Sequence, residues 1–369
     1  MNLNLKNDPL KRYLINYDYL KYKLDKVFTI GITGSCGKTT ISSYLYYFLK
    51  TKIKDILYIS THKIYFNDLT INTNNTTLEI NNLIDILHTY KIKPKMIIME
   101  VSSHGINQAR INCFKYDILA LSNLGQDHLD YHLNINNYHN VKLSFLNSSI
   151  YSKLILIPEI YKNKYHFNNK KIKFFNYDDN YLNTFNTISF NKENMYIAYL
   201  ILKYLKYKKE EIISYLNTIT IDNGRMQLIK DNNRNIIIDY AHHVESFKAI
   251  LNNNNFNKVV VFGCGGNRDK SKRNIMGSIA CAYCKYVIIT SDNSRDENLT
   301  DIIKDITKDI NNYKVIEDRK KAIKYAIKTY KDLDVYILGK GNEDYIIQNN
   351  TKIKHNDKQY VLELLNNHL

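Results

Sequence analysis

The chain has 369 residues, of which 44% are hydrophobic, so it is long enough for two or three domains with sizeable cores. It contains no run of about 18 apolar residues and no secretory leader, so we expect a cytoplasmic protein that binds no membrane. The net charge is +16, but the lysines are spread along the chain without a recognition-module signature, so the charge alone does not predict binding to nucleic acid.

Strands and helices alternate in the first part of the chain. After a polar N-terminal segment at residues 1–27, expected to be helical, an apolar run rich in β-branched residues at 26–33 predicts a buried strand. A Gly-rich turn and an amphipathic helix ending at Leu49 follow. Further strand candidates lie at residues 96–101, 117–122 and 153–157. This alternation predicts a parallel sheet with helices on both faces, in a domain at residues 28–222.

A second block with the same pattern begins near Asn223, after a polar, Asn-rich stretch at residues 168–186. Its strand candidates lie at residues 235–239, 258–262, 286–291, 313–317 and 334–338. The pattern predicts a second α/β domain at residues 223–369.

The strongest single motif is Thr33-Gly-Ser-Cys-Gly-Lys-Thr-Thr40, between a predicted strand and a predicted helix. Glycines let backbone N–H groups surround phosphate oxygens, and the helix N-terminus adds its positive end. The spacing departs from the standard phosphate loop, because Ile32 stands five residues before Gly37, but the strand–loop–helix context supports the assignment. The alternative is a Gly-rich turn with an incidental lysine. The residues that we expect to contact ATP here are Gly34, Ser35, Cys36, Gly37, Lys38, Thr39 and Thr40.

Acidic and histidine residues follow two of the predicted strands. A nucleotide site needs Mg²⁺, which prefers hard oxygen ligands, and the carboxyl end of a strand is where α/β sheets bind ligands. Glu100 ends an apolar strand, and His128 lies in a turn dense in Asp and His after the next one. We therefore predict that Thr39, through its hydroxyl, and Glu100 hold metal, and that His128 is a second ligand or a supporting residue.

The motifs together resemble a known family. TGSCGKTT, EVSSHGINQAR, SNLGQDHLDYH and YHNVKLSF resemble the central domain of Mur ligases, and NGRMQ, IDYAH, VFGCGGNRDK, SDNSRDE and LGKGNEDY resemble their third domain. The resemblance covers residues 28–369 in the correct order. It implies an α/β fold, with a P-loop-type parallel-sheet central ATPase domain followed by a Rossmann-like C-terminal domain.

The resemblance also implies a reaction. ATP phosphorylates a substrate carboxylate, and an amine attacks the acyl phosphate to form an amide. Lys142, which the sequence alone would place on the surface, matches a lysine that is carbamylated in the family and helps to hold Mg²⁺. Lys38, Lys142 and His128 are the expected catalytic residues. Further nucleotide contacts are expected at Asn191, Arg225, Asp239 and His242.

Among Mur ligases, the chain is most similar to the type that adds the third amino acid of the peptidoglycan precursor. Positions matching contacts to UDP-N-acetylmuramoyl-L-alanyl-D-glutamate (UDP-MurNAc-L-Ala-D-Glu) are Thr76, Thr77, Ser102, Gln108 and Arg110. Those matching contacts to meso-diaminopimelate are Arg268, Asp292, Asn293, Arg295, Gly339 and Glu343. A guanidinium at Arg295 suits the distal carboxylate, which L-lysine lacks, and Glu343 suits the distal ammonium. We expect a monomer.

Some features depart from the family and leave alternatives open. The family's N-terminal domain, which holds the uridine group, is largely missing, and His243-Val-Glu245, Asn267 and Asn342 replace family residues. Alternatives within the superfamily are an L-lysine-adding or a folylpolyglutamate-type ligase. Outside catalysis, the alternatives are a binding or scaffold protein and, from charge alone, a nucleic-acid-binding module.

Overall fold

The computed structural model describes residue 24 and residues 26–366 apart from 62, 74, 186, 188, 220–223 and 254, with the backbone alone at 189 and 190. Most of the predicted N-terminal segment at 1–27 and the predicted boundary between residues 222 and 223 lie outside the described residues. The chain separates into two compact units. Unit 1 comprises Met1–Gly125 and Asn134–Ile219, and unit 2 comprises Gln126–Leu133 and Thr220–Leu369.

The sheet of unit 1 has eight strands in the order β4-β3-β2-β5-β1-β6-β7-β8. Its strands are β1 (Phe28–Thr33), β2 (Ile56–Ser60), β3 (Lys63–Phe66), β4 (Leu69–Asn72), β5 (Met96–Val101), β6 (Ile118–Leu121), β7 (Leu154–Pro158) and β8 (Ile172–Phe175). The pairs β2–β3 and β3–β4 are antiparallel and the other pairs are parallel. Strand β1 lies between β5 and β6, which brings the ends of three strands together at one edge.

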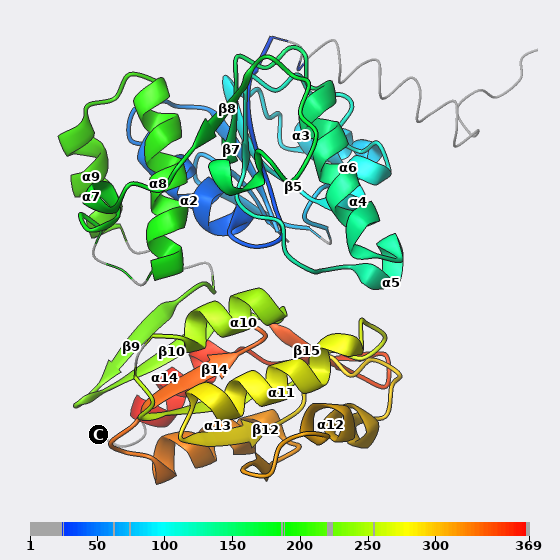
Figure 1. Cartoon of the computed structure of the whole chain (residues 1–369), viewed down its shortest axis with the longest axis vertical. Helices are drawn as coiled ribbons and strands as arrows, with labels where there is room; N and C mark the ends of the chain where they lie inside the picture. Colours follow the sequence, from blue (N-terminus) through cyan, green and yellow to red (C-terminus); the bar gives the residue numbers. More distant parts are fainter. Residues whose placement is uncertain are drawn as a thin grey trace, which may run out of the picture. The chain divides into compact units, whose positions relative to one another are not determined.

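Helices cover both faces of this sheet (Figure 1), with α2 and α8 on one side and α3, α4 and α6 on the other. The helices are α2 (Lys38–Leu49), α3 (Ile80–Thr89), α4 (Ser103–Asn107), α6 (Ile135–Ser148), η2 (Glu159–Tyr161), α7 (Asp179–Leu182), α8 (Ser189–Tyr204) and α9 (Lys209–Thr218). Because both faces are covered, β1, β2, β5, β6 and β7 are buried along almost their whole length.

Unit 2 has a six-stranded sheet in the order β13-β12-β11-β14-β10-β9, in which the pair β9–β10 is antiparallel and the other pairs are parallel. Its strands are β9 (Gln227–Asp231), β10 (Arg234–Asp239), β11 (Lys258–Phe262), β12 (Tyr286–Ile289), β13 (Lys314–Val315) and β14 (Asp334–Leu338), and a separate hairpin is formed by β15 (Tyr345–Gln348) and β16 (Thr351–Lys354). Its helices are α5 (Leu129–His132), α10 (Val244–Leu251), α11 (Ser271–Tyr283), α12 (Leu299–Thr307), α13 (Arg319–Thr329) and α14 (Asp357–Asn366). One face of the sheet packs its valines and isoleucines on α13 and α14.

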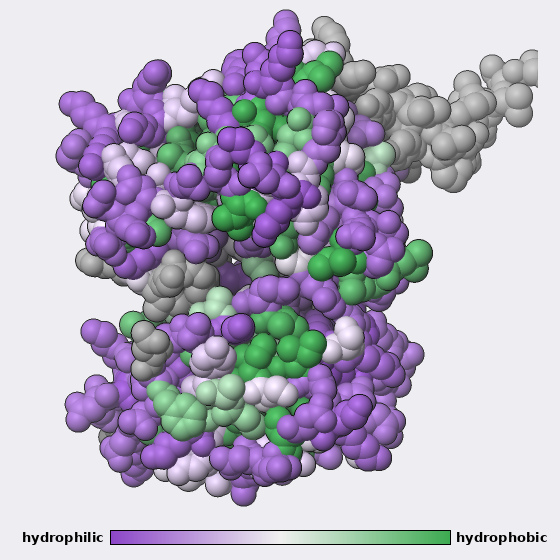
Figure 2. Space-filling view, viewed as in Figure 1, coloured by the Kyte–Doolittle hydropathy of each residue, from purple (hydrophilic) through white to green (hydrophobic). Residues whose placement is uncertain are grey.

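The predicted α/β fold is confirmed, and each of the nine predicted strands lies within a few residues of an observed one. The two predicted parallel sheets also contain antiparallel pairs, which involve β3, β4 and β9 at or near the sheet edges. The polar, Asn-rich stretch at residues 168–186, for which no element was predicted, contains β8 and α7. Within the described residues, no helix has the length and hydropathy needed to cross a membrane. Hydrophilic residues dominate the face drawn in Figure 2.

Candidate functional site

The predicted phosphate loop lies at the carboxyl edge of the first sheet. Thr33, the last residue of β1, pairs with Val101 of β5 and with Leu121 of β6, so the segments that follow all three strands meet there. Helix α2 begins at Lys38, directly after Gly37. Gly37 has a φ of 82°, and a side chain there would collide with that of Asn194 on α8, so the turn requires glycine.

Hydrogen bonds hold the loop against the segment after β6. The amides of Ser35 and Cys36 donate to Asn123, to its carbonyl at 3.0 Å and to its Oδ1 at 2.9 Å. Lys38 Nζ donates to the carbonyls of Gly34, at 2.6 Å, and Ser35, at 2.9 Å, so its ammonium lies across the loop. The first amides of α2 have no acceptor within the helix, and together with this ammonium they suit an anion such as phosphate.

Glu100 is fully buried beside the first turn of α2. Its Oε2 accepts hydrogen bonds from Thr39 Oγ1 at 2.7 Å and Thr61 Oγ1 at 2.9 Å. Its Oε1 accepts from Ser60 Oγ at 2.6 Å and from the Thr61 amide at 3.1 Å. The structure therefore brings the predicted metal residues Thr39 and Glu100 together. Ser60 and Thr61 were missed, because Ser60 ends strand β2 and Thr61 follows it, and the pattern did not predict this strand.

This pair can contribute to a magnesium site. Thr39 donates its one hydroxyl proton to Glu100, so the lone pairs of its oxygen are left for a cation. Hydroxyl and carboxylate oxygens are ligands that Mg²⁺ prefers, with water and phosphate oxygens completing the shell. The described residues contain no group of three or more His, Cys, Asp or Glu that could hold a metal by themselves. The donor set fits a metal shared with a phosphate better than a closed protein cage.

Lys142 is buried on α6, with 1% of its surface exposed, so the interpretation as a surface lysine is wrong. Its Nζ lies 3.5 Å from the centre of the Tyr138 ring, a cation–π contact. Tyr138 in turn donates its hydroxyl to Ser35 Oγ at 3.0 Å. The helix that carries Lys142 is thus joined to the phosphate loop.

The residues predicted to hold the nucleotide-sugar peptide lie around Glu100. Thr77 Oγ1 donates to the Glu100 carbonyl at 3.2 Å and lies 3.0 Å from Ser102 Oγ. Arg110 Nη1 donates to the Thr77 carbonyl at 3.0 Å. Thr76 Oγ1 lies 3.2 Å from Thr61 Oγ1. Polar side chains therefore gather in unit 1 beside the candidate metal pair.

Two further predicted residues of unit 1 lie at helix ends. Gln108 is the residue at which α4 ends. Asn191 is buried in the first turn of α8, one turn before Asn194, whose side chain faces Gly37. The position of Asn191 is consistent with the predicted nucleotide contact, which stays a prediction.

His128 belongs to unit 2, where it adopts a left-handed backbone with a φ of 51°. Its Nε2 lies 3.1 Å from Asp127 Oδ2, and the same oxygen lies 3.1 Å from His243 Nε2. Asp127 therefore links two histidines that are far apart in the sequence. Neither Asp127 nor His243 was predicted as a site residue, and the metal-binding role of His128 stays a prediction.

The predicted nucleotide residues of unit 2 lie at the end of β10. Asp239 accepts the amides of Met226 and Ala241, both at 2.7 Å, and burial raises the pKa of its carboxyl. Arg225 stacks 4.5 Å from the centre of the Tyr240 ring. Burial, with the charge of Lys272, lowers the pKa of His242 to about 3. His242 is therefore neutral at pH 7, and its Nδ1 lies 2.7 Å from the carbonyl of Tyr240.

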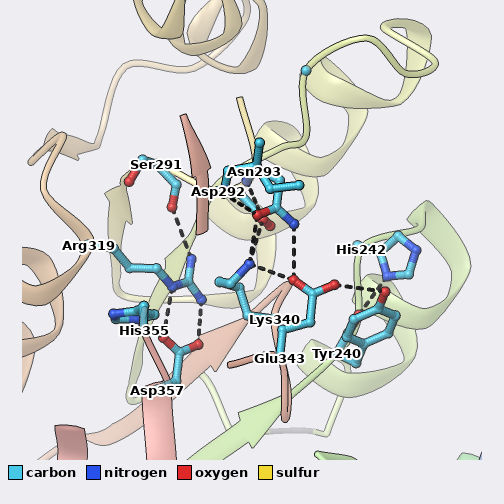
Figure 3. Close-up of polar contacts among 12 residues, drawn as sticks. Tyr240, His242, Ser291, Asp292, Asn293, Arg319, Lys340, Glu343, His355 and Asp357 are labelled. Carbon is cyan, nitrogen blue, oxygen red and sulfur yellow. Dashed lines mark hydrogen bonds and ion pairs between the residues drawn. The ribbon is translucent and has the colours of Figure 1, made fainter. Parts of the chain in front are cut away.

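Three of the residues predicted to recognise diaminopimelate form one cluster (Figure 3). Glu343 Oε2 accepts from Asn293 Nδ2 at 3.0 Å and from Lys340 Nζ at 2.6 Å, and its Oε1 accepts from Tyr240 at 3.2 Å. Burial alone would raise the pKa of Asp292, but the positive charges of Lys340 and Arg319 lower it. Lys340 and Tyr240 lie within the LGKGNEDY and IDYAH motifs but were not predicted as site residues, because a lysine and a tyrosine by themselves carry no signal for a particular contact.

The remaining predicted residues surround this cluster. Arg295 Nη1 donates to the carbonyls of Gly266 at 2.7 Å and Asn293 at 3.2 Å, and burial together with the nearby charge of Arg268 lowers its pKa. A buried guanidinium next to another cation favours contact with an anion. Gly339 follows β14 and donates its amide to the carbonyl of Asp239 at 3.0 Å, which links this region to the end of β10.

A buried ion pair lies behind the cluster. Arg319 donates to Asp357 at 2.9 Å from Nε and at 2.7 Å from Nη2, and His355 Nε2 lies 2.7 Å from the same carboxylate. Arg319 also donates to the carbonyls of Ser291 at 3.3 Å and Leu338 at 3.0 Å. Those carbonyls directly precede the motifs that begin at Asp292 and Gly339, so Arg319 fixes the backbone on which the cluster is built.

Comparisons with known proteins agree with the motifs. The Mur ligase middle domain matches residues 32–222, and the Mur ligase glutamate ligase domain matches residues 224–341. The UDP-N-acetylmuramoyl-L-alanyl-D-glutamate–2,6-diaminopimelate ligase of Wigglesworthia glossinidia brevipalpis is 31% identical over 98% of this chain and 83% of that protein. The ligase of the same name from Helicobacter pylori is 32% identical over 94% of this chain and 86% of that protein.

Solved structures give the same relationship. A structure of a UDP-N-acetylmuramoyl-L-alanyl-D-glutamate–2,6-diaminopimelate ligase superposes with a TM-score of 0.59 at 26% identity, covering 95% of this chain and 81% of that one. Escherichia coli FolC, in complex with DHPP and ADP, superposes with a TM-score of 0.65 at 14% identity, over 89% of both chains, and shares the fold. The resemblance drawn from the sequence motifs is confirmed: the chain belongs to the Mur ligase family.

Proposed function

We propose that the protein is an ATP-dependent amide ligase that joins meso-diaminopimelate to UDP-MurNAc-L-Ala-D-Glu. The names and identities of its relatives support this reaction. The observation that carries the proposal is the contact of Thr39 with the buried Glu100 at the first turn of α2, next to the ammonium of Lys38. This arrangement provides the cation, the helix N-terminus and the oxygen ligands that a nucleoside triphosphate with Mg²⁺ requires.

In the first step, the substrate carboxylate would attack the γ-phosphorus of ATP, with ADP as the leaving group. The loop amides and Lys38 would offset the negative charge that spreads over the γ-phosphoryl oxygens. Thr39 and Glu100, together with His128 and a carbamylated Lys142, would hold magnesium. Bound Mg²⁺ would neutralise phosphate charge and orient the reacting oxygens.

In the second step, the amine would attack the acyl phosphate, and inorganic phosphate would leave as the amide forms. The nucleotide-sugar peptide would be held close to Thr39 and Glu100 by Thr76, Thr77, Ser102, Gln108 and Arg110. The rate of this step would therefore be raised mainly by positioning of the reactants. Asn191, Arg225, Asp239 and His242 would complete the nucleotide site.

The amine would be recognised in unit 2 by charge. Arg295 and Arg268 would bind the distal carboxylate of diaminopimelate, for which the fork of a guanidinium is suited, and Glu343 would bind the distal ammonium. Asp292, Asn293 and Gly339 would shape the same site. L-Lysine would offer no distal carboxylate to Arg295, so we propose diaminopimelate as the substrate. The domain boundaries at 28–222 and 223–369, the monomeric state and the cytoplasmic location remain predictions.

One assay separates a diaminopimelate-adding ligase from an L-lysine-adding ligase, a folylpolyglutamate-type ligase and a non-catalytic protein. Purified protein with ATP, Mg²⁺ and UDP-MurNAc-L-Ala-D-Glu receives meso-diaminopimelate, L-lysine or L-glutamate in turn, and phosphate release and product mass are measured. We expect a product with diaminopimelate alone. Equal turnover with L-lysine would refute the assignment of the amine. Glutamate-dependent turnover would favour a folylpolyglutamate-type ligase, and no turnover with any amine would favour a non-catalytic protein.

A further inference from the structure

We call Tyr240, Asp292, Asn293, Lys340 and Glu343 the amine-recognition cluster. Lys340 is the buried cation of this cluster. It follows Gly339 at the end of β14, and none of its surface is exposed. Its Nζ donates to Glu343 Oε2 at 2.6 Å and to Asn293 Oδ1 at 3.1 Å, and it lies 3.4 Å from Asp292 Oδ1 (Figure 3). A buried ammonium is stable when its charge is balanced and its three protons have acceptors, and this one meets both conditions.

The contacts of Lys340 fix the orientation of two neighbouring side chains. Asn293 Oδ1 accepts from Lys340 and from the amide of Ile347 at 2.8 Å, so its Nδ2 is turned toward Glu343. Glu343 then has a donor on each oxygen, with Tyr240 on the other side. Removing the ammonium would take one of two described donors from Glu343 Oε2 and one of two from Asn293 Oδ1, so both side chains would be held less firmly.

The backbone under these side chains is already fixed by Arg319, which binds the carbonyls of Ser291 and Leu338. The remaining conformational freedom of the cluster therefore lies mostly in its side chains. Lys340 restricts that freedom, because it is the one group that contacts Asp292, Asn293 and Glu343 at once among the described contacts of the cluster.

We propose that Lys340 is a positioning residue for the amine substrate, an inference that rests on the proposed function. Lys340 supplies the positive charge that contacts both carboxylates of the cluster, Asp292 and Glu343. Without Lys340, Asp292 and Glu343 would lose the one cation that contacts both of them, so their side chains would be held less firmly. The geometry thus makes the affinity for the amine depend on a residue that need not touch it.

The test measures binding and turnover separately in the full-length protein. The variants are Lys340→Met, Lys340→Gln, Glu343→Gln and the double variant Lys340→Met/Glu343→Gln. The matched control is Lys258→Met, because Lys258 is an equally buried lysine of unit 2 that donates to the Leu251 carbonyl and to Asn253 Oδ1, both at 2.5 Å. Calorimetry gives the dissociation constant of meso-diaminopimelate, and phosphate release gives the KM for the amine and for ATP.

We expect Lys340→Met to weaken diaminopimelate binding about tenfold or more while the KM for ATP changes less than about twofold. Glu343→Gln should add less than about twofold in the Lys340→Met background, because the two residues act as one unit. Lys258→Met should lower thermal stability and leave diaminopimelate binding within about twofold. If Lys340→Met does not fold, Lys340→Gln, which keeps hydrogen bonds but no charge, should show the same loss of binding.

The inference would be overturned if the folded Lys340 variants bound diaminopimelate within about twofold of the parent. It would also be overturned if the loss of affinity in the double variant equalled the product of the losses in the two single variants. A parent protein that binds no diaminopimelate would also overturn it. Binding that depends on Lys340 in a protein that forms no amide would instead refute the proposed function and support the inference.

Discussion

Replacing Asp357 by Asn should weaken unit 2 more than any change of a surface charge. Asp357 and Arg319 have no exposed side-chain surface, and the carboxylate accepts two hydrogen bonds from the guanidinium. The change removes the negative charge and places an amide N–H₂ against guanidinium N–H groups. The buried guanidinium of Arg319 is then left without its counter-charge. Two of its N–H donors must also share the single oxygen of the new amide.

The expected loss follows from these contacts. Breaking a buried ion pair by removing one partner lowers stability by about 3–5 kcal/mol. In a unit of this size, 1 kcal/mol shifts the melting temperature by about 2–4 °C, so the melting transition should fall by about 6–20 °C. The KM for the amine should also rise, because Arg319 holds the carbonyls of Ser291 and Leu338 beneath the amine-recognition cluster.

Differential scanning calorimetry provides the assay, since the two units can melt in separate transitions. Asp301→Asn is the matched control: Asp301 lies 3.8 Å from Lys304, and both side chains are mostly exposed. Such a pair contributes about 0–1 kcal/mol, so the control should melt within about 4 °C of the parent. Equal shifts for the two variants would refute the argument that burial gives this ion pair its strength.

Three further variants test the site. Lys38→Ala should lower ATP-dependent phosphate release about 100-fold or more, because the loop loses its cation; near-parental release would contradict the phosphate-loop assignment. Arg295→Lys should raise the KM for diaminopimelate about tenfold and leave that for ATP unchanged, since an ammonium lacks the fork of a guanidinium; parental kinetics would exclude this contact. His242→Gln should remove a pH effect on denaturant-measured stability. Unfolded His242 binds a proton below about pH 6.5 and the folded residue only near pH 3, so parental stability should fall between these values as pH decreases, and parallel curves for parent and variant would argue against it.

The strands predicted from the sequence are those whose burial makes them continuously apolar. β5 and β11 are buried at every position and were predicted with their observed bounds. The missed strands include β4, β8, β9 and β16, which lie at sheet edges or in the hairpin. Most of their residues are exposed or partly exposed, so they show no continuous apolar run. Strand β2 is also buried at every position, and its omission has no such explanation.

The candidate site was predicted correctly where a residue's position at the end of a strand determines which residues it meets. Glu100 ends a buried strand beside the strand of the phosphate loop, and parallel pairing then brings it to Thr39. Ser60, Thr61 and Lys340 could not be predicted this way, because hydroxyl and ammonium groups are common on surfaces and their roles depend on partners far apart in the sequence. The burial of Lys142 was missed for the same reason.

Glu100 of unit 1 differs from Asp357 and Glu343 of unit 2 in what balances the charge of its carboxylate. In unit 2, Asp357 is paired with Arg319, and Glu343 is paired with Lys340, so the protein supplies the cation. In unit 1, the described hydrogen bonds to the Glu100 side chain come from three hydroxyls and one backbone amide, which stabilise a carboxylate without neutralising it. A fully buried anion of this kind is costly unless a cation comes from outside the chain. The contrast therefore favours Glu100 as the place where an external metal acts, and the paired carboxylates of unit 2 as groups that order a binding site.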